Sequence, residues 1–161
     1  MRFIDIFSPN GRGARALFGI TKSEMVTDLL IEQWSADVVN RGIGSEGDGC
    51  IVVRAAERGC YILSRKQEGM WLSAFYSKGD QVDATGAGNT FLGAFTIGLI
   101  RINSIVQAAM FGRVGASFVV EQVGPTTLGK DGQVSRAAFT RLSRKNCFLN
   151  KTLYIGSSKY I

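Results

Sequence analysis

The chain has 161 residues, of which 45% are hydrophobic and 20% charged, and its formal net charge is +6. This composition is typical of a single globular domain and differs from that of disordered or collagen-like chains. The sequence contains no histidine, which excludes Ser/His/Asp triads, Cys/His triads and His-based metal sites within this chain.

In the first half of the chain, the residue pattern predicts a strand followed by a helix. Arg2–Ser8 is an apolar run that predicts a strand, which Pro9-Asn10-Gly11 ends. The run is too short for a signal peptide, and no stretch reaches the roughly 20 apolar residues of a membrane span, so we expect a soluble, cytoplasmic protein without a membrane partner. Apolar residues at helical spacing predict a helix over Ser23–Val39, with Thr21 or Ser23 as its cap.

Three further strands are predicted after the Gly-rich loop over residues 42–49. Cys50–Val53 is an unbroken apolar run, which is typical of a strand buried on both faces of a parallel sheet. Cys60–Leu63 and Trp71–Tyr76 predict two more strands. The three cysteines, Cys50, Cys60 and Cys147, include no CxxC pair, so we expect reduced thiols and no zinc site.

The second half of the chain is predicted to be helical. An apolar helix follows Asn89 and ends near Leu99, a second spans Ser104–Val120, and a third spans Ser135–Arg144. Strands that alternate with helices in this order predict an α/β fold with a mainly parallel sheet.

The excess positive charge lies at the carboxyl end of the chain. Residues 132–161 contain no acidic residue and six basic ones, namely Arg136, Arg141, Arg144, Lys145, Lys151 and Lys159. A basic tail of this kind can bind RNA, but it has few interleaved aromatic residues and also fits a solvated helix end or a frayed terminus.

The segment Val82–Phe95, VDATGAGNTFLGAF, contains the clearest functional motif. Its glycines at 86 and 88 lie at the start of the predicted helix. Backbone N–H groups without intrahelical partners point out of the helix there, at the positive end of the helix dipole. The absence of side chains there lets a phosphate approach the backbone closely. Alternatively, the small residues only let the helix pack tightly against the sheet.

This segment resembles the late signature D-T-T-G-A-G-D-x-F-x-G-A of the PfkB carbohydrate kinases, also called the ribokinase-like family. The resemblance continues on both sides in the same order. Phe7–Asn10 resembles the family's P-N-x-x-E, Ile51–Gly59 its V-V-x-T-L-G-x-x-G, and Phe111–Gly124 its helix of small residues that ends in a Gly turn.

The resemblance implies a ribokinase-like three-layer fold, of which this chain corresponds to the C-terminal half. We therefore expect a partial nucleotide-binding domain over residues 3–142 and a basic tail over residues 143–161. Asn89–Gly93 together with Ser117–Gly124 looks most similar to a fungal branch associated with maintenance of a killer double-stranded RNA virus, in which GAGD becomes GAGN.

For the site, the resemblance implies ATP with Mg²⁺, and phosphoryl transfer to a sugar or similar alcohol. The anion-hole and nucleotide-binding positions are then Thr85, Gly86, Ala87, Gly88, Arg54, Gly59 and Asn10. Asp83 and Gly124 match a site for a monovalent cation such as K⁺, although Asp83 alternatively caps the following turn. Arg54, where the family has Thr, either donates to phosphate or is an ordinary arginine at a strand end.

Three departures from the family pattern predict impaired catalysis. Asn89 stands at the Asp base position and cannot accept a proton near neutral pH, Gly13 replaces the Glu of P-N-x-x-E, and Ala56 replaces a glycine. Two hypotheses follow. The chain is either the nucleotide-binding half of a kinase that needs an N-terminal half from the same gene or another chain, or a pseudokinase that binds nucleotide and acts as a scaffold.

Overall fold

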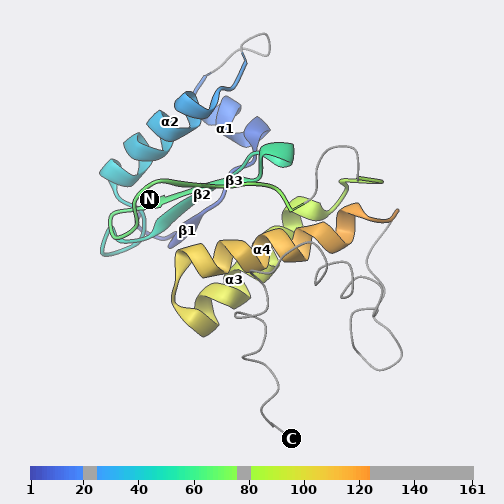
Figure 1. Ribbon diagram of the computed structural model, residues 1–161. Helices are drawn as coiled ribbons and strands as arrows, with labels where there is room; N and C mark the ends of the chain where they lie inside the picture. The colour runs from blue at the N-terminus through green and yellow to red at the C-terminus, as the bar shows by residue number, and fades with distance from the viewer. Residues whose placement is uncertain (20–24, 76–80, 124–161) are drawn as a thin grey trace, which may run out of the picture. The chain divides into compact units, whose positions relative to one another are not determined.

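The computed structural model of the protein describes residues 1–19, 25–75 and 81–123 (Figure 1), all within one compact unit, Met1–Gly124. The elements in chain order are β1 (Ile6–Phe7), α1 (Gly11–Leu17), α2 (Asp28–Arg41), β2 (Cys50–Arg54), the 3₁₀ helix η1 (Ala56–Arg58), β3 (Cys60–Ser64), β4 (Met70–Leu72), α3 (Ala87–Ile102) and α4 (Ile105–Val120). The predicted helix Ser135–Arg144, Cys147 and the basic tail 143–161 lie outside the described residues.

The described strands form one mixed sheet in the order β1-β2-β3-β4. The pairing of β1 with β2 is parallel, whereas β2 with β3 and β3 with β4 are antiparallel. The prediction of a mainly parallel sheet is therefore wrong for these strands. The short connections 55–59 and 65–69 allow only antiparallel pairing, because a parallel return needs a crossover of a dozen or more residues. Only the β1–β2 connection, which contains α2, is long enough for such a crossover.

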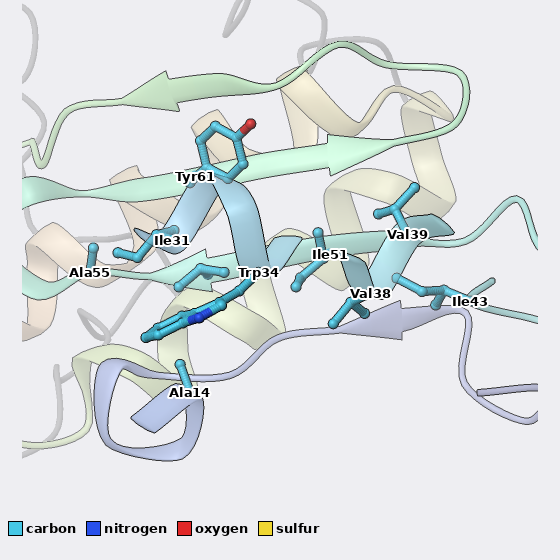
Figure 2. Close-up of a cluster of buried hydrophobic side chains, with 10 residues drawn as sticks. Ala14, Ile31, Trp34, Val38, Val39, Ile43, Ile51, Ala55 and Tyr61 are labelled. Carbon is cyan, nitrogen blue, oxygen red and sulfur yellow. The ribbon is translucent and has the colours of Figure 1, made fainter. Parts of the chain in front are cut away.

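One face of the sheet is covered by α1 and α2 (Figure 1). Figure 2 shows Trp34 of α2 lying between the sheet and Ala14 of α1, and the ring of Trp34 also stacks on Phe18 at a centroid distance of 4.7 Å. The helix α2 begins at Asp28 because Thr27 Oγ1 accepts a hydrogen bond from the Leu30 amide. The candidate caps at positions 21 and 23 lie outside the described residues.

The opposite face of the sheet is covered by the antiparallel hairpin of α3 and α4. Phe91 and Phe95 of α3 stack at a centroid distance of 6.1 Å. A Cβ on Gly112 of α4 would lie 2.8 Å from the ring of Phe91, so glycine is required for this close approach. The strand β2 is buried on both faces, as its sequence predicts, with Ile51 and Val53 against α2 and Cys50 and Val52 against the hairpin.

Three boundary predictions were wrong and one helix was missed. The strand predicted over Arg2–Ser8 is limited to Ile6–Phe7, the strand predicted over Trp71–Tyr76 is Met70–Leu72, and the helix predicted over Ser23–Val39 is Asp28–Arg41. The helix α1 was not predicted, because its sequence GRGARAL contains two glycines, which lower helix propensity. Among the described segments, no helix combines the length and apolar character needed to cross a membrane.

Candidate functional site

The loop that enters α3 is held by short-range hydrogen bonds. Gly86 is the N-cap residue and adopts φ +86° and ψ −17°, a left-handed conformation that favours glycine. The carboxylate of Asp83 accepts a hydrogen bond from the Thr85 amide at 2.9 Å. The amides of Val82 and Asp83 donate to the carbonyl of Val120 at 2.8 and 3.3 Å, so the loop is fixed against the end of α4.

The first turn of α3 presents two amides without acceptors. Ala87 donates to the carbonyl of Ala84 at 3.2 Å, and Asn89 and Thr90 both donate to the carbonyl of Gly86 at 3.0 Å. Within the described part of the chain, the amides of Gly86 and Gly88 have no recorded hydrogen-bond acceptor. Two free N–H donors at the positive end of a helix dipole form a suitable environment for an anion.

Arg54, at the end of β2, connects this turn to the sheet. Its guanidinium Nη1 donates to the carbonyl of Gly88 at 2.9 Å, and Nη2 donates to the carbonyl of Ser8 at 2.9 Å. The side chain is partly buried and forms no ion pair with a carboxylate of the described residues. Arg54 fixes the carbonyl side of the turn that presents the free amides.

A cavity of about 150 Å³ lies beside this turn. The cavity is lined by four of the residues that the family resemblance assigns to phosphate or nucleotide binding, namely Arg54, Gly59, Ala87 and Gly88. Most of the other lining residues are small or apolar, including Ala56, Ala74, Phe91, Ala116 and Val120. A mostly apolar hollow with a few polar groups in its wall is the usual form of a small-molecule site.

Asn89 and Asn10 do not line the cavity. Asn89 is exposed on the first turn of α3, and its side chain has no hydrogen bond in the described structure. Asn10 forms a backbone bridge with Arg54, which places it at the same end of the sheet, but its side chain caps α1 by accepting from the Gly13 amide at 2.7 Å. Gly13 itself provides no carboxylate there.

Only one of the two residues expected at the monovalent-cation site, Asp83, is described. The pKa of Asp83 lies below its usual value, because its carboxylate accepts hydrogen bonds from the backbone and side chain of Thr85. One of its oxygens therefore caps the turn, and Gly124, the other predicted ligand, lies outside the described residues. Nowhere in residues 1–19, 25–75 and 81–123 do three or more His, Cys, Asp or Glu side chains gather into a group that could hold a metal ion, and the cation site at Asp83 and Gly124 stays a prediction.

Arg113 is a cavity-lining residue that the sequence reasoning missed. It is the one charged residue in the sequence of α4, IVQAAMFGRVGASFVV, and this isolated charge in an apolar helix was the available signal. Its charge opposes the effect of burial on the nearby thiol of Cys60, whose pKa burial raises to about 12. Burial also raises the pKa of Cys50 to about 11, so both free thiols remain protonated at neutral pH.

Ala56 at the cavity wall has an unfavourable backbone conformation. Its φ of +53° is left-handed, where a Cβ costs roughly 1–2 kcal/mol. We expect Ala56→Gly to raise the free energy of unfolding by about 0.5–1 kcal/mol, since relief of this strain exceeds the added entropy of the unfolded chain. Urea denaturation tests this prediction, with Ala16→Gly on the exposed side of α1 as the control, and a loss of stability at position 56 would contradict it.

Comparison with known proteins identifies a family match. A model of the pfkB family carbohydrate kinases matches residues 1–131. Among curated proteins, inositol 3-kinase of Arabidopsis thaliana is 40% identical over 75 residues, which cover 47% of this chain and 20% of that protein. An uncharacterised protein of Schizosaccharomyces pombe is 30% identical over 138 residues, which cover 77% of this chain and 38% of that protein.

Solved structures with the same fold include three sugar kinases. Arabidopsis thaliana ribokinase complexed with ribose and ATP has a TM-score of 0.65 at 24% identity, and Thermotoga maritima ribokinase a TM-score of 0.63 at 22% identity. Escherichia coli phosphofructokinase-2 in complex with potassium has a TM-score of 0.66 at 20% identity. The matches cover 88–89% of this chain and 42% of each of those chains, so the chain spans less than half of each kinase.

Proposed function

Because the chain belongs to the pfkB family of carbohydrate kinases, we propose that it is the phosphate-binding half of an ATP-dependent kinase for a sugar or similar alcohol. The observation that carries this proposal is the amino end of α3, where the free amides of Gly86 and Gly88 lie beside the cavity. Inositol 3-kinase and the ribokinases are named for alcohol acceptors, which supports an acceptor of that class.

In the proposed reaction, a hydroxyl oxygen of the acceptor attacks the γ-phosphorus of ATP and forms the new P–O bond. The bond between this phosphorus and the bridging oxygen of ADP breaks, and the hydroxyl proton passes to a base or to water. The amides of Gly86 and Gly88 stabilise the negative charge on the transferring group. Arg54 keeps this turn in position through the Gly88 carbonyl.

The proposed catalysis is weak, because Asn89 stands at the family's base position. An amide side chain cannot accept the hydroxyl proton near neutral pH. General-base catalysis contributes about 10²- to 10⁴-fold, so the missing base slows transfer by up to that factor. Positioning and charge stabilisation remain available to this half of the site.

Mg²⁺ is proposed to enter with the nucleotide, because Gly13 replaces the carboxylate of the family's P-N-x-x-E pattern. A K⁺ site at Asp83 and Gly124 remains a prediction, since only one carboxylate oxygen of Asp83 accepts from the Thr85 amide and Gly124 lies outside the described residues.

We expect ATP to bind weakly and Gly88→Val to reduce its affinity at least tenfold. A Cβ at position 88 would lie 2.7 Å from Arg54 Nη1, so the side chain displaces Arg54 and covers the amide. Calorimetry of the full chain with ATP and Mg²⁺ measures the change. Gly93→Val on the same helix is the matched control, since no atom lies within 4 Å of a Cβ there. A folded parent chain that binds no ATP at millimolar concentration would disprove the proposed function.

The second candidate is a pseudokinase that binds nucleotide and acts as a scaffold. Asn89 and Gly13 favour this candidate, because each removes a group that the reaction needs. Nucleotide binding without phosphorylation of any sugar or cyclitol, when the other half of the kinase is supplied, would distinguish it from a slow enzyme. RNA binding by the basic tail and the cytoplasmic location remain predictions.

A further inference from the structure

Arg113 has no partner within the described protein. Its Nε atom is buried and has no hydrogen bond, and no carboxylate forms an ion pair with the guanidinium. Burial lowers the pKa of the guanidinium. The guanidinium as a whole is only partly buried, but a buried N–H donor without an acceptor is costly. The contacts of the described residues therefore leave this N–H group without a partner.

Arg113 and Arg54 line the same cavity. The Nε atom of Arg54 is likewise buried and without a partner, since its two terminal nitrogens are used by backbone carbonyls. Glu57 also lines the cavity but is exposed, and it forms no ion pair with either arginine. The cavity wall therefore holds two guanidinium groups that no described carboxylate neutralises.

The α3–α4 pairing separates Arg113 from the free amides. A Cβ on Gly86 would lie 3.7 Å from Cγ1 of Val119, which places Val119 at the level of the α3 amino end. Arg113 precedes Val119 by six residues, or about 9 Å along the axis of α4 at 1.5 Å per residue. The cavity wall therefore includes Gly88 at the amino end of α3 and a positive group, Arg113, farther along α4.

We propose that Arg113 is a ligand-binding residue, which pairs with the far end of an oligophosphate group whose near end lies at the amides of Gly86 and Gly88. This inference rests on the proposed function and assigns the cavity to a phosphate chain. An anionic partner is favoured over a neutral acceptor, because hydrogen bonds from an arginine to a phosphate oxygen are charge-assisted and therefore stronger. The phosphate chain belongs either to a nucleotide or to an inorganic oligophosphate, since both present the same oxygens.

The test combines binding and stability measurements on the full chain. ATP and inorganic tripolyphosphate are titrated by calorimetry into the parent, Arg113→Gln and Arg113→Lys. We expect Arg113→Gln to weaken both ligands at least tenfold and Arg113→Lys to weaken them less. Arg101→Gln removes an exposed charge from the last turn of α3 and should change affinity less than twofold. If the parent binds ATP but not tripolyphosphate, the ligand is a nucleotide. If it binds both with equal affinity, the phosphate chain alone is recognised.

The unliganded proteins provide a second readout. Because the partly buried guanidinium of Arg113 forms no ion pair with a described carboxylate, Arg113→Gln should raise the melting temperature by roughly 2–4 °C, whereas loss of a structural arginine would lower it. A lower melting temperature, or failure to fold, would overturn the proposal. Unchanged ATP and tripolyphosphate affinity in Arg113→Gln would overturn it while leaving the proposed function intact. A folded parent that binds neither ligand would contradict both.

Discussion

Gly59→Ala is expected to lower the free energy of unfolding by about 3–5 kcal/mol, the largest effect of any single substitution considered for this chain. Gly59 adopts φ +93° and ψ −125°, a conformation that is essentially restricted to glycine. A Cβ there would overlap the carbonyl oxygen of Leu72 and lie 2.5 Å from the amide nitrogen of Ala74. Both contacts are to backbone, so a side-chain rotation cannot relieve them.

The expected loss is a large part of the total stability of a typical domain, which is about 5–15 kcal/mol. Urea denaturation followed by circular dichroism measures it. Gly11→Ala is the matched control, because no atom lies within 4 Å of a Cβ at position 11 and the residue begins α1. A loss below about 1 kcal/mol at position 59 would show that the turn between β2 and β3 can change shape.

This turn also forms part of the cavity wall. Gly59 and Ala56 both line the cavity, and Arg54 immediately precedes the turn. A shift of the backbone here therefore moves the cavity wall as well as the β2–β3 hairpin. We expect Gly59→Ala to weaken ATP binding, even in conditions where the substituted chain remains folded.

The sequence predicted the elements whose apolar pattern is continuous. Two-sided burial of β2 follows from its unbroken apolar run, and the helix predicted over Ser104–Val120 is α4, whose N-cap in the structure is Ser104. The mixed sheet was not predicted, although the short connections 55–59 and 65–69 contained that information. The strand β1 is short because only Ile6 and Phe7 pair with β2, a limit that depends on the partner strand rather than on local composition.

The sequence predicts where the candidate site lies in the chain, but it does not predict which contacts hold the site in place. The Gly-Ala-Gly sequence indicated a helix entrance, and α3 begins at Ala87. Which amides lack acceptors depends on the left-handed conformation of Gly86, which the sequence permits but does not specify. The contact between Arg54 and the Gly88 carbonyl joins residues 34 positions apart, and local patterns carry no information about such pairs.

Asn89→Asp is expected to restore phosphoryl transfer by at most about 10²- to 10⁴-fold. The change is made in a chimera that joins this chain to a competent N-terminal half from a relative, which would supply the acceptor pocket. An aspartate at this exposed first-turn position provides a proton acceptor beside the free amides of Gly86 and Gly88. Steady-state phosphorylation of a sugar or cyclitol acceptor measures the gain.

The same substitution has a separate effect on stability. The first turn of α3 contains no acidic residue, so a carboxylate there interacts favourably with the helix dipole and adds about 0.3–1 kcal/mol. Asn40→Asp, on an exposed position of α2, introduces the same charge away from the cavity and should leave turnover unchanged. A stability gain with no gain in turnover would show that the carboxylate is in place and that another defect limits the reaction.

Gly13→Glu, added to Asn89→Asp, tests where such a defect lies. A Cβ at position 13 would lie 3.3 Å from Asn10 Oδ1, so the cap of α1 must move by a few tenths of an ångström to accept the glutamate. We expect a further increase in turnover, since the glutamate restores the carboxylate of the family's P-N-x-x-E pattern. High activity with Asn89 unchanged would contradict the proposed impairment and require another base, with Asp83 as the first candidate. If the double variant folds and binds ATP but stays inactive, the backbone around Arg54 and Ala56 prevents productive alignment of the nucleotide, and the scaffold function is favoured.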